Sequence, residues 1–276
     1  MGMRVTTNIS AINAQRNLIG NQRQMQNSMA QMSSGSRINK SADDAAGLAI
    51  SENMKAQIKS SAQARRNAND GISLVQTAEG GLSEVSNVVT RLRELGIQAA
   101  SDTIGDRERG FVDKEVQQLK TEMNRIANTT SWNSTKLIDG STPAFDFQVG
   151  MNSTENDVIT FNASENAATL EALGMAEMSF LTKEGARSSL GILDEGQTRI
   201  NGMRANLGAL QNRLTTTTDI LAVTEENLSA ANSRIRDTDL AAASSEMARN
   251  TVLLQAGTAT LAQANQTNQM ALKLIG

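Results

Sequence analysis

The chain has 276 residues, a formal net charge of −3, no histidine and no cysteine, and only 2% of its residues are aromatic. This charge argues against the basic surface that nucleic-acid binding needs, and the missing side chains remove the commonest general base and all thiolate chemistry. A single proline and few large rings favour long helices packed side by side over a globular enzyme core. We therefore expect no catalytic, cofactor-binding or metal-binding residues and no nucleic-acid partner.

An amphipathic helix is predicted over residues 5–32, because its apolar residues recur in steps of three, four and seven. Ile9, Ile12 and Ile19 are among them. The polar side carries glutamine and asparagine instead of the lysine and arginine excess of helices that lie on membranes. The pattern favours a helix that packs on other helices over one that lies on a membrane.

Two further signals bear on membranes and export. No stretch holds about 18 consecutive apolar residues, so no membrane insertion is expected. The first residues lack the apolar run of a signal peptide, so we expect export by a route without a cleaved signal.

Residues 33–50, SSGSRINKSADDAAGLAI, predict a break followed by the start of a second helix. Gly35 is a typical helix terminator, and Ser41 is the candidate N-cap. Asp43 and Asp44 fall in the first turn, where the helix dipole favours negative charge. Adjacent carboxylates on a helix point about 100° apart, which argues against a metal or acid–base pair here.

Two more helices are predicted, over residues 48–100 and 112–126, with a turn between them. One heptad column of the first is Val75, Leu82 and Val89. Further on, apolar and polar residues alternate in two runs between residues 145 and 162, and a turn-rich segment separates them. This pattern predicts a small β-hairpin.

The last third of the chain carries the strongest pattern, a heptad repeat of leucine and isoleucine. A sustained repeat of this kind is typical of a helix that winds against other helices. The register slips once, between Ile235 and Leu240. The first column includes Leu207, Leu214, Leu221, Leu228 and Ile235, and the second is Leu240, Met247, Leu254, Leu261 and Ile275, with Asn268 between the last two.

These patterns predict a mainly α fold. Its N- and C-terminal arms would form a long antiparallel coiled coil or helix-bundle hairpin, with a small β-hairpin region in the middle.

The motif at 33–50 is similar to the N-terminal signature of bacterial flagellins, and NANDGISLVQTAEG at 67–80 and ENLSAANSRIRD at 226–237 resemble two more blocks of that family. The resemblance implies a structural subunit that self-assembles into the helical filament of the bacterial flagellum, for motility. It also implies an inner terminal-helix domain of residues 1–45 plus 236–276 and an intermediate helical rod domain of residues 46–235. Outer domains would be absent or minimal, because only about 50 residues separate the helical arms. Two other readings stay open, a hook–filament junction protein and a chemoreceptor-like signalling coiled coil. An enzyme is the least favoured reading.

The same resemblance implies partners and a location. The partners are other flagellin subunits in a homopolymer, the flagellar export apparatus, an export chaperone, and the hook-associated and cap proteins. The location is the extracellular filament. By resemblance alone, Arg91, Leu95 and Glu115 are candidate contacts for the innate flagellin receptor of animal hosts; otherwise they are ordinary helix-surface and seam residues.

The terminal arms carry narrow apolar stripes, which an isolated helix pair could not fully bury. Ordering a chain costs about 1–2 kcal/mol per residue, so we expect both arms to be disordered in the monomer and to order when many copies pack laterally. The predicted polymerisation seam is Ile9, Ile12, Ile19, Leu240, Met247, Leu254, Leu261 and Ile275. The predicted rod core is Val75, Leu82, Val89, Leu207, Leu214, Leu221, Leu228 and Ile235.

Overall fold

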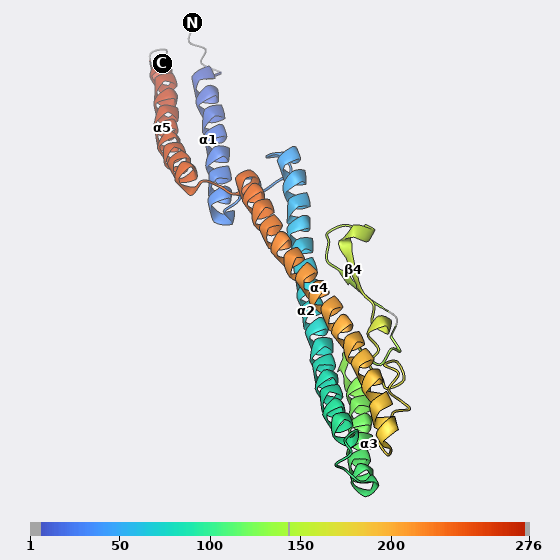
Figure 1. The fold of residues 1–276 in the computed structure, drawn as a ribbon. Helices are drawn as coiled ribbons and strands as arrows, with labels where there is room; N and C mark the ends of the chain where they lie inside the picture. Colours follow the sequence, from blue (N-terminus) through green and yellow to red (C-terminus); the bar gives the residue numbers. More distant parts are fainter. Residues whose placement is uncertain (1–6, 143, 274–276) are drawn as a thin grey trace. The chain divides into compact units, whose positions relative to one another are not determined.

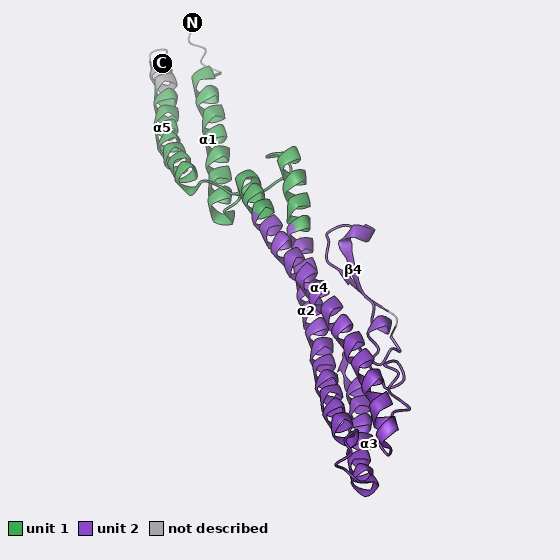
Figure 2. Ribbon diagram, in the orientation of Figure 1, with its two compact units in different colours: residues 1–57, 227–276 green, residues 58–226 purple. Residues whose placement is uncertain are grey.

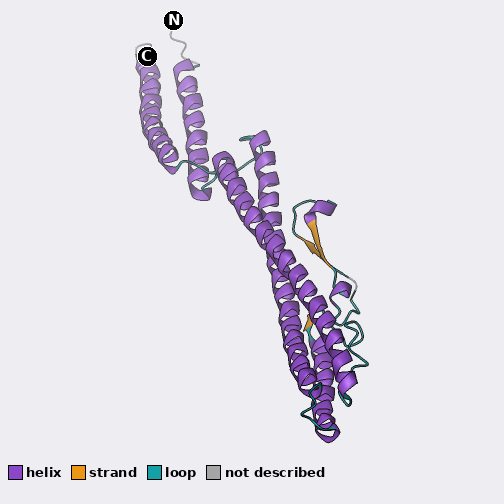
Figure 3. Ribbon diagram, viewed as in Figure 1, coloured by secondary structure: helices purple, strands orange, loops and turns teal. Residues whose placement is uncertain are grey.

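The structure, a computed structural model, describes residues 7–142 and 144–273. Over these residues the chain is mainly helical, as the sequence predicted (Figure 1). The helices are α1 (Ile9–Ser34), α2 (Ala45–Ala99), α3 (Asp106–Thr129), α4 (Lys183–Arg236) and α5 (Leu240–Lys273). Short strands and turns fill the segment between α3 and α4 (Figure 3). They are β1 (Ser131–Trp132), β2 (Thr135–Lys136), β3 (Phe145–Gln148), η1 (Glu155–Asp157), β4 (Val158–Phe161) and η2 (Ser164–Asn166).

The chain divides into two compact units (Figure 2). The first combines residues 1–57 with 227–276, and the second is formed by residues 58–226. In the first unit α1 and α5 pack closely along each other. They run antiparallel, since the start of α1 lies beside the end of α5 (Figure 1). The predicted antiparallel pairing of the terminal arms is confirmed, whereas the divisions between the compact units fall inside α2 and α4.

The contiguous hydrophobic core lies in the second unit, and its members come from residues 68–214. α2, α3 and α4 each contribute a face of buried aliphatic side chains at helical spacing. The loop after β4 closes this core, because Met175 and Phe180 are fully buried in it. Large apolar side chains that are this well buried make the second unit the stable part of the chain.

Two small hairpins sit between α3 and α4. β3 pairs antiparallel with β4 and places Phe145 opposite Phe161, with ring centroids 6.0 Å apart. This is the hairpin that alternation predicted. β1 and β2 form a second hairpin that the sequence analysis missed; its turn residues Asn133 and Ser134 have φ of 45° and 65°, the left-handed region that asparagine tolerates.

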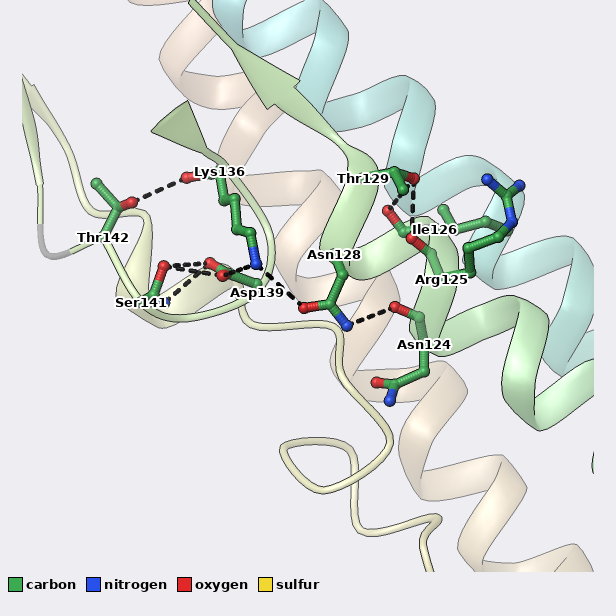
Figure 4. A network of polar contacts seen from close by, with 9 residues as sticks. All are labelled: Asn124, Arg125, Ile126, Asn128, Thr129, Lys136, Asp139, Ser141 and Thr142. Atoms are coloured by element: carbon green, nitrogen blue, oxygen red, sulfur yellow. Dashed lines mark hydrogen bonds and ion pairs between the residues drawn. The ribbon is translucent and has the colours of Figure 1, made fainter. Parts of the chain in front are cut away.

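A polar network holds the segment after β2 against the end of α3 (Figure 4). The Asp139 carboxylate accepts hydrogen bonds from the Ser141 backbone N–H (2.9 Å) and from the Ser141 hydroxyl (2.8 Å), and its side chain is 8% exposed. Lys136 lies 3.4 Å from the same carboxylate and donates to the Asn128 side chain. Burial alone would raise the pKa of Asp139, but the bonds from Ser141 and Lys136 together hold it below its usual value.

Core truncation is the first test of this architecture. Leu82→Ala should lower the free energy of unfolding of the second unit by about 2–5 kcal/mol, because it removes a fully buried side chain and leaves a cavity. The matched control Leu181→Ala removes the same atoms from a residue that is 54% exposed, and should change stability by about 0.5 kcal/mol or less. Urea unfolding followed by circular dichroism measures both; equal losses would contradict the placement of the core.

The Asp139 network predicts a pH dependence with a defined sign. A carboxyl whose pKa is lowered by folding stabilises the protein above its unfolded pKa of about 4, and this contribution is lost as the pH falls through the folded pKa. Asp139→Asn should therefore cost about 1–2 kcal/mol at pH 7 and progressively less below pH 4. Urea unfolding at a series of pH values tests this; a difference from wild type that stays constant down to pH 3 would contradict it.

Candidate assembly interface

Side-chain caps fix the starts of α1 and α5. The Asn8 side chain accepts from the Ala11 N–H (3.0 Å) at the start of α1 and donates to the Ala264 carbonyl of α5 (2.9 Å). α1 stops at Gly35, whose φ of 68° suits a residue without a Cβ. Asp239 accepts from the N–H groups of Ala241 and Ala242 at the start of α5. Both helices therefore begin or end at defined residues.

One face of each helix is packed within the chain, and its members recur at the three–four spacing of an a/d seam. On α1 the packed face is Ala11, Ala14, Leu18, Asn21, Met25, Ser28 and Met32. On α5 it is Ala243, Met247, Asn250, Leu254, Gly257, Leu261 and Ala264. Many of these side chains are small or polar, so the helices approach closely; a Cβ on Gly257 would lie 3.6 Å from Leu18.

The structure divides the predicted polymerisation seam into two groups. Met247, Leu254 and Leu261 are half-buried on the face of α5 that packs against α1. The other described members are exposed, with exposed fractions of 60% for Ile9, 48% for Ile12, 45% for Ile19 and 57% for Leu240. Ile275 lies outside the described residues.

Exposed apolar side chains continue beyond the predicted seam. Met29 is 53% exposed, Val252 63% and Leu253 38%. Met29 belongs to the apolar pattern that predicted the first helix, but it was not included in the predicted seam. Val252 and Leu253 were missed because a heptad column selects one residue per repeat and passes over its neighbours; the adjacent leucines 253 and 254 were the available signal. Several exposed large apolar residues on one helix pair are more than an isolated monomer helix pair needs, and they are candidates for contact with other chains.

The predicted rod-core residues lie mainly in the second unit. Val75, Leu82, Val89, Leu207, Leu214 and Leu221 are buried, at 6% exposure or less. Leu228 and Ile235 are half-buried and belong to the first unit. The heptad column of α4 thus runs through both units, and its burial decreases toward the end of the helix.

The three candidate receptor contacts differ in accessibility. Arg91 of α2 is exposed and pairs with Glu115 of α3 at 2.8 Å and with Glu94 at 2.9 Å. These hydrogen bonds, to Glu94 and then to Glu115, raise the pKa of Arg91. Leu95 is only 2% exposed and belongs to the core. The structure therefore presents Arg91 and Glu115 on the surface and keeps Leu95 inside.

Neither a metal site nor a membrane span is found in the part of the chain that the structure describes. Within residues 7–142 and 144–273, no three aspartate or glutamate side chains are grouped so that they could hold a metal ion. None of the helices described there is both long and apolar enough to cross a membrane.

Comparison with known proteins matches both ends of the chain. The model for the bacterial flagellin N-terminal helical region matches residues 5–142, and the model for the C-terminal helical region matches residues 190–275. A flagellin of Halalkalibacterium halodurans is 43% identical over 99% of this chain and all of its own length. A flagellar filament core protein of Brachyspira hyodysenteriae is 41% identical, also over 99% of this chain and all of its own length.

Solved structures agree with the fold. The crystal structure of Bacillus cereus flagellin has a TM-score of 0.50 and 27% identity, and covers 56% of this chain and 88% of its own. A flagellar hook-associated protein of Vibrio parahaemolyticus has a TM-score of 0.58 over 71% of this chain and all of its own, but at 13% identity this likeness concerns the fold alone. The junction-protein and chemoreceptor readings thus find no support. The chain belongs to the bacterial flagellin family, and it is a structural subunit of the flagellar filament, not an enzyme.

Proposed function

We propose that copies of this chain pack into the filament through the exposed apolar residues of α1 and α5, and that both helices become ordered only on assembly. The observation that carries this proposal is the unequal burial of the two units. The hydrophobic core lies within residues 68–214, in the second unit. Among the described residues of the first unit, Ile38 is the one large apolar side chain that is fully buried.

The physical reason is the balance of burial and chain entropy. α1 and α5 together order 60 residues (26 and 34), and each ordered residue costs about 1–2 kcal/mol. Their mutual seam contains alanine, glycine, serine and asparagine, which bury little apolar surface. Covering Ile9, Ile12, Ile19, Leu240 and Val252 by neighbouring copies adds apolar burial that the isolated pair lacks. Folding of the arms is then coupled to polymerisation.

The contact between copies is heterologous in this proposal. Residues on one helix of a copy meet different residues on the next copy, and such a contact generates an open helical polymer when it does not close into a ring. Self-assembly into a homopolymer is what membership of the flagellin family implies. The filament such subunits form is extracellular.

The other partners inferred from the resemblance belong to the proposal as well. They are the export apparatus, an export chaperone, and the hook-associated and cap proteins, which would handle the chain before or at incorporation. A contact with the host flagellin receptor would use Arg91 and Glu115 directly, since both are on the surface. Leu95 would have to leave the core to take part, because it is 2% exposed.

The test is a double substitution in the exposed apolar residues of α1, Ile9, Ile12 and Ile19, which together with Leu240, Val252 and Leu253 of α5 are here called the exposed stripe. Ile12→Ser with Ile19→Ser should raise the critical concentration for polymerisation at least about tenfold, since burying one isoleucine contributes about 1.5–3 kcal/mol and about 1.4 kcal/mol is a factor of ten. Sedimentation after addition of ammonium sulfate, which strengthens apolar burial, measures it.

The matched control is Asn13→Ser with Asn17→Ser, at exposed polar positions of the same helix. It should pellet like the wild-type chain. Thermal unfolding of the second unit should be unchanged in both double variants, because neither pair touches its core. Equal critical concentrations for the isoleucine and asparagine variants would refute the proposed interface.

A further inference from the structure

The packed seam of α1 and α5 fits in more than one register. Leu18 lies opposite Gly257, and the antiparallel three–four spacing then places Met25 opposite Asn250 and Ala14 opposite Leu261. Each of these layers sets one large side chain against a small or polar one. Large side chains alternate between the two helices, so the packed faces of α1 and α5 are complementary to each other.

The same complementarity survives a slip of one heptad, about 10 Å along the helix axis. In that register Leu18 would face Asn250 and Met25 would face Ala243, again large against small or polar. Ala14 would face Leu254. The inner layers therefore discriminate weakly between the two registers, and the choice must be made elsewhere.

The linkers that leave α1 and enter α5 are joined by backbone hydrogen bonds. The Arg37 N–H donates to the Arg236 carbonyl (2.6 Å), and the Thr238 N–H donates to the Gly35 carbonyl (3.0 Å). Between these bonds Ser36 and Asp237 form an isolated antiparallel bridge. Both linkers belong to the first unit, as do α1 and α5.

Side chains reinforce this pairing. The Arg37 guanidinium donates to the Ile235 carbonyl (2.7 Å), and Gln31 in the last turns of α1 donates to the Arg37 carbonyl (3.0 Å). Ile38, the next residue, is 2% exposed. It packs so closely on the start of α2 that a Cβ on Gly47 would lie 2.8 Å from its Cδ1. The two residues that follow the bridge are thus anchored, Arg37 to the end of α4 and Ile38 to the start of α2.

Only Gly35 separates this bridge from α1, and only two residues separate it from α5. Gly35 terminates α1 directly before it, and Asp239 caps the start of α5 two residues after Asp237. A slip of one heptad therefore requires breaking the bridge and its flanking bonds. We propose that Gly35, Ser36 and Arg37 with Asp237 and Thr238, here called the linker clamp, determine the register of α1 against α5. This goes beyond the proposed assembly function, because it concerns pairing within one chain.

The clamp also bears on the exposed stripe. A slip of α5 by one heptad would move Leu240, Val252 and Leu253 about 10 Å relative to Ile9, Ile12 and Ile19. Neighbouring copies would then meet a different surface. The clamp residues are accordingly specificity-determining for assembly, although they do not belong to the exposed stripe.

The test uses engineered cysteines, since the natural chain has none. Leu18→Cys with Gly257→Cys reports the observed register, and Leu18→Cys with Asn250→Cys reports the slipped one. Each pair is introduced into the wild-type background and into two clamp variants. Arg37→Ala removes the side-chain donor, and Arg37→Ala with Thr238→Pro also removes a backbone donor. Arg16→Ala, an exposed arginine on α1, is the matched control.

The measured quantity is the ratio of slipped to native disulfide in a glutathione redox buffer, in filaments, where the proposed function has both arms ordered. We expect the double clamp variant to raise this ratio at least about tenfold, because each hydrogen bond that it loses should change the equilibrium between the two registers by about two- to tenfold. Arg37→Ala alone should raise it less, and Arg16→Ala should leave it unchanged. A clamp variant that does not form filaments alone is assembled with an excess of wild-type chain. A variant that is excluded from these mixed filaments, while Arg16→Ala enters them, has lost the register-dependent surface.

Two results would overturn the proposal. One is an unchanged ratio in both clamp variants, which would mean that the packed faces of α1 and α5 select the register by themselves. The other is the absence of the native disulfide from wild-type filaments. Pelleting is scored separately, so a failure of the proposed assembly surface remains distinguishable: the isoleucine variants would then pellet normally while the clamp still controlled the disulfide ratio.

Discussion

Apolar burial is distributed unequally along this chain, and its other properties follow from that distribution. The second unit holds a contiguous core of aliphatic side chains from α2, α3 and α4, closed by Phe180 and the loop around it. The first unit has large apolar residues as well, but many of them face outward. In our proposal, one part of such a chain can fold by itself, and the exposed apolar residues of the other part are covered only by neighbouring copies.

The small residues of the α1–α5 seam have a structural consequence. Close approach of the helix backbones, as at Leu18 and Gly257, yields a thin pair whose outer faces remain available to other copies. The cost is weak discrimination between registers, because alternating large and small residues repeat every heptad. Backbone hydrogen bonds between the linkers, with Arg37 and Ile38 beside them, select the register that the packed faces of α1 and α5 leave open. In the first unit, hydrogen bonds between the linkers thus determine the register, and the apolar side chains provide the surface for other copies.

The sequence predicted the helices, the β3–β4 hairpin and the antiparallel pairing of the arms, because heptad spacing and alternation reflect local periodicity. It did not predict the short β1–β2 hairpin, whose signal is two turn residues. It favoured Ser41 as the cap of α2, whereas Asp44 accepts the Gly47 N–H (2.8 Å) and Asp43 instead accepts from the preceding turn. Periodicity also could not reveal which apolar stripe faces α5 and which faces outward. Which residues face inward depends on how two helices that are far apart in the sequence fit together, as the half-buried Leu254 and the exposed Ile12 illustrate.

Hydrogen–deuterium exchange with mass spectrometry, on the monomer and on sedimented filaments, tests the central claim most directly. The account predicts that peptides from α1 and α5 exchange within seconds in the monomer and become protected in the filament. Peptides from the core segments of α2, α3 and α4 should be protected in both states, because their burial does not depend on neighbours. Strong protection of α1 and α5 in the monomer, unchanged by polymerisation, would contradict assembly-coupled ordering of the arms.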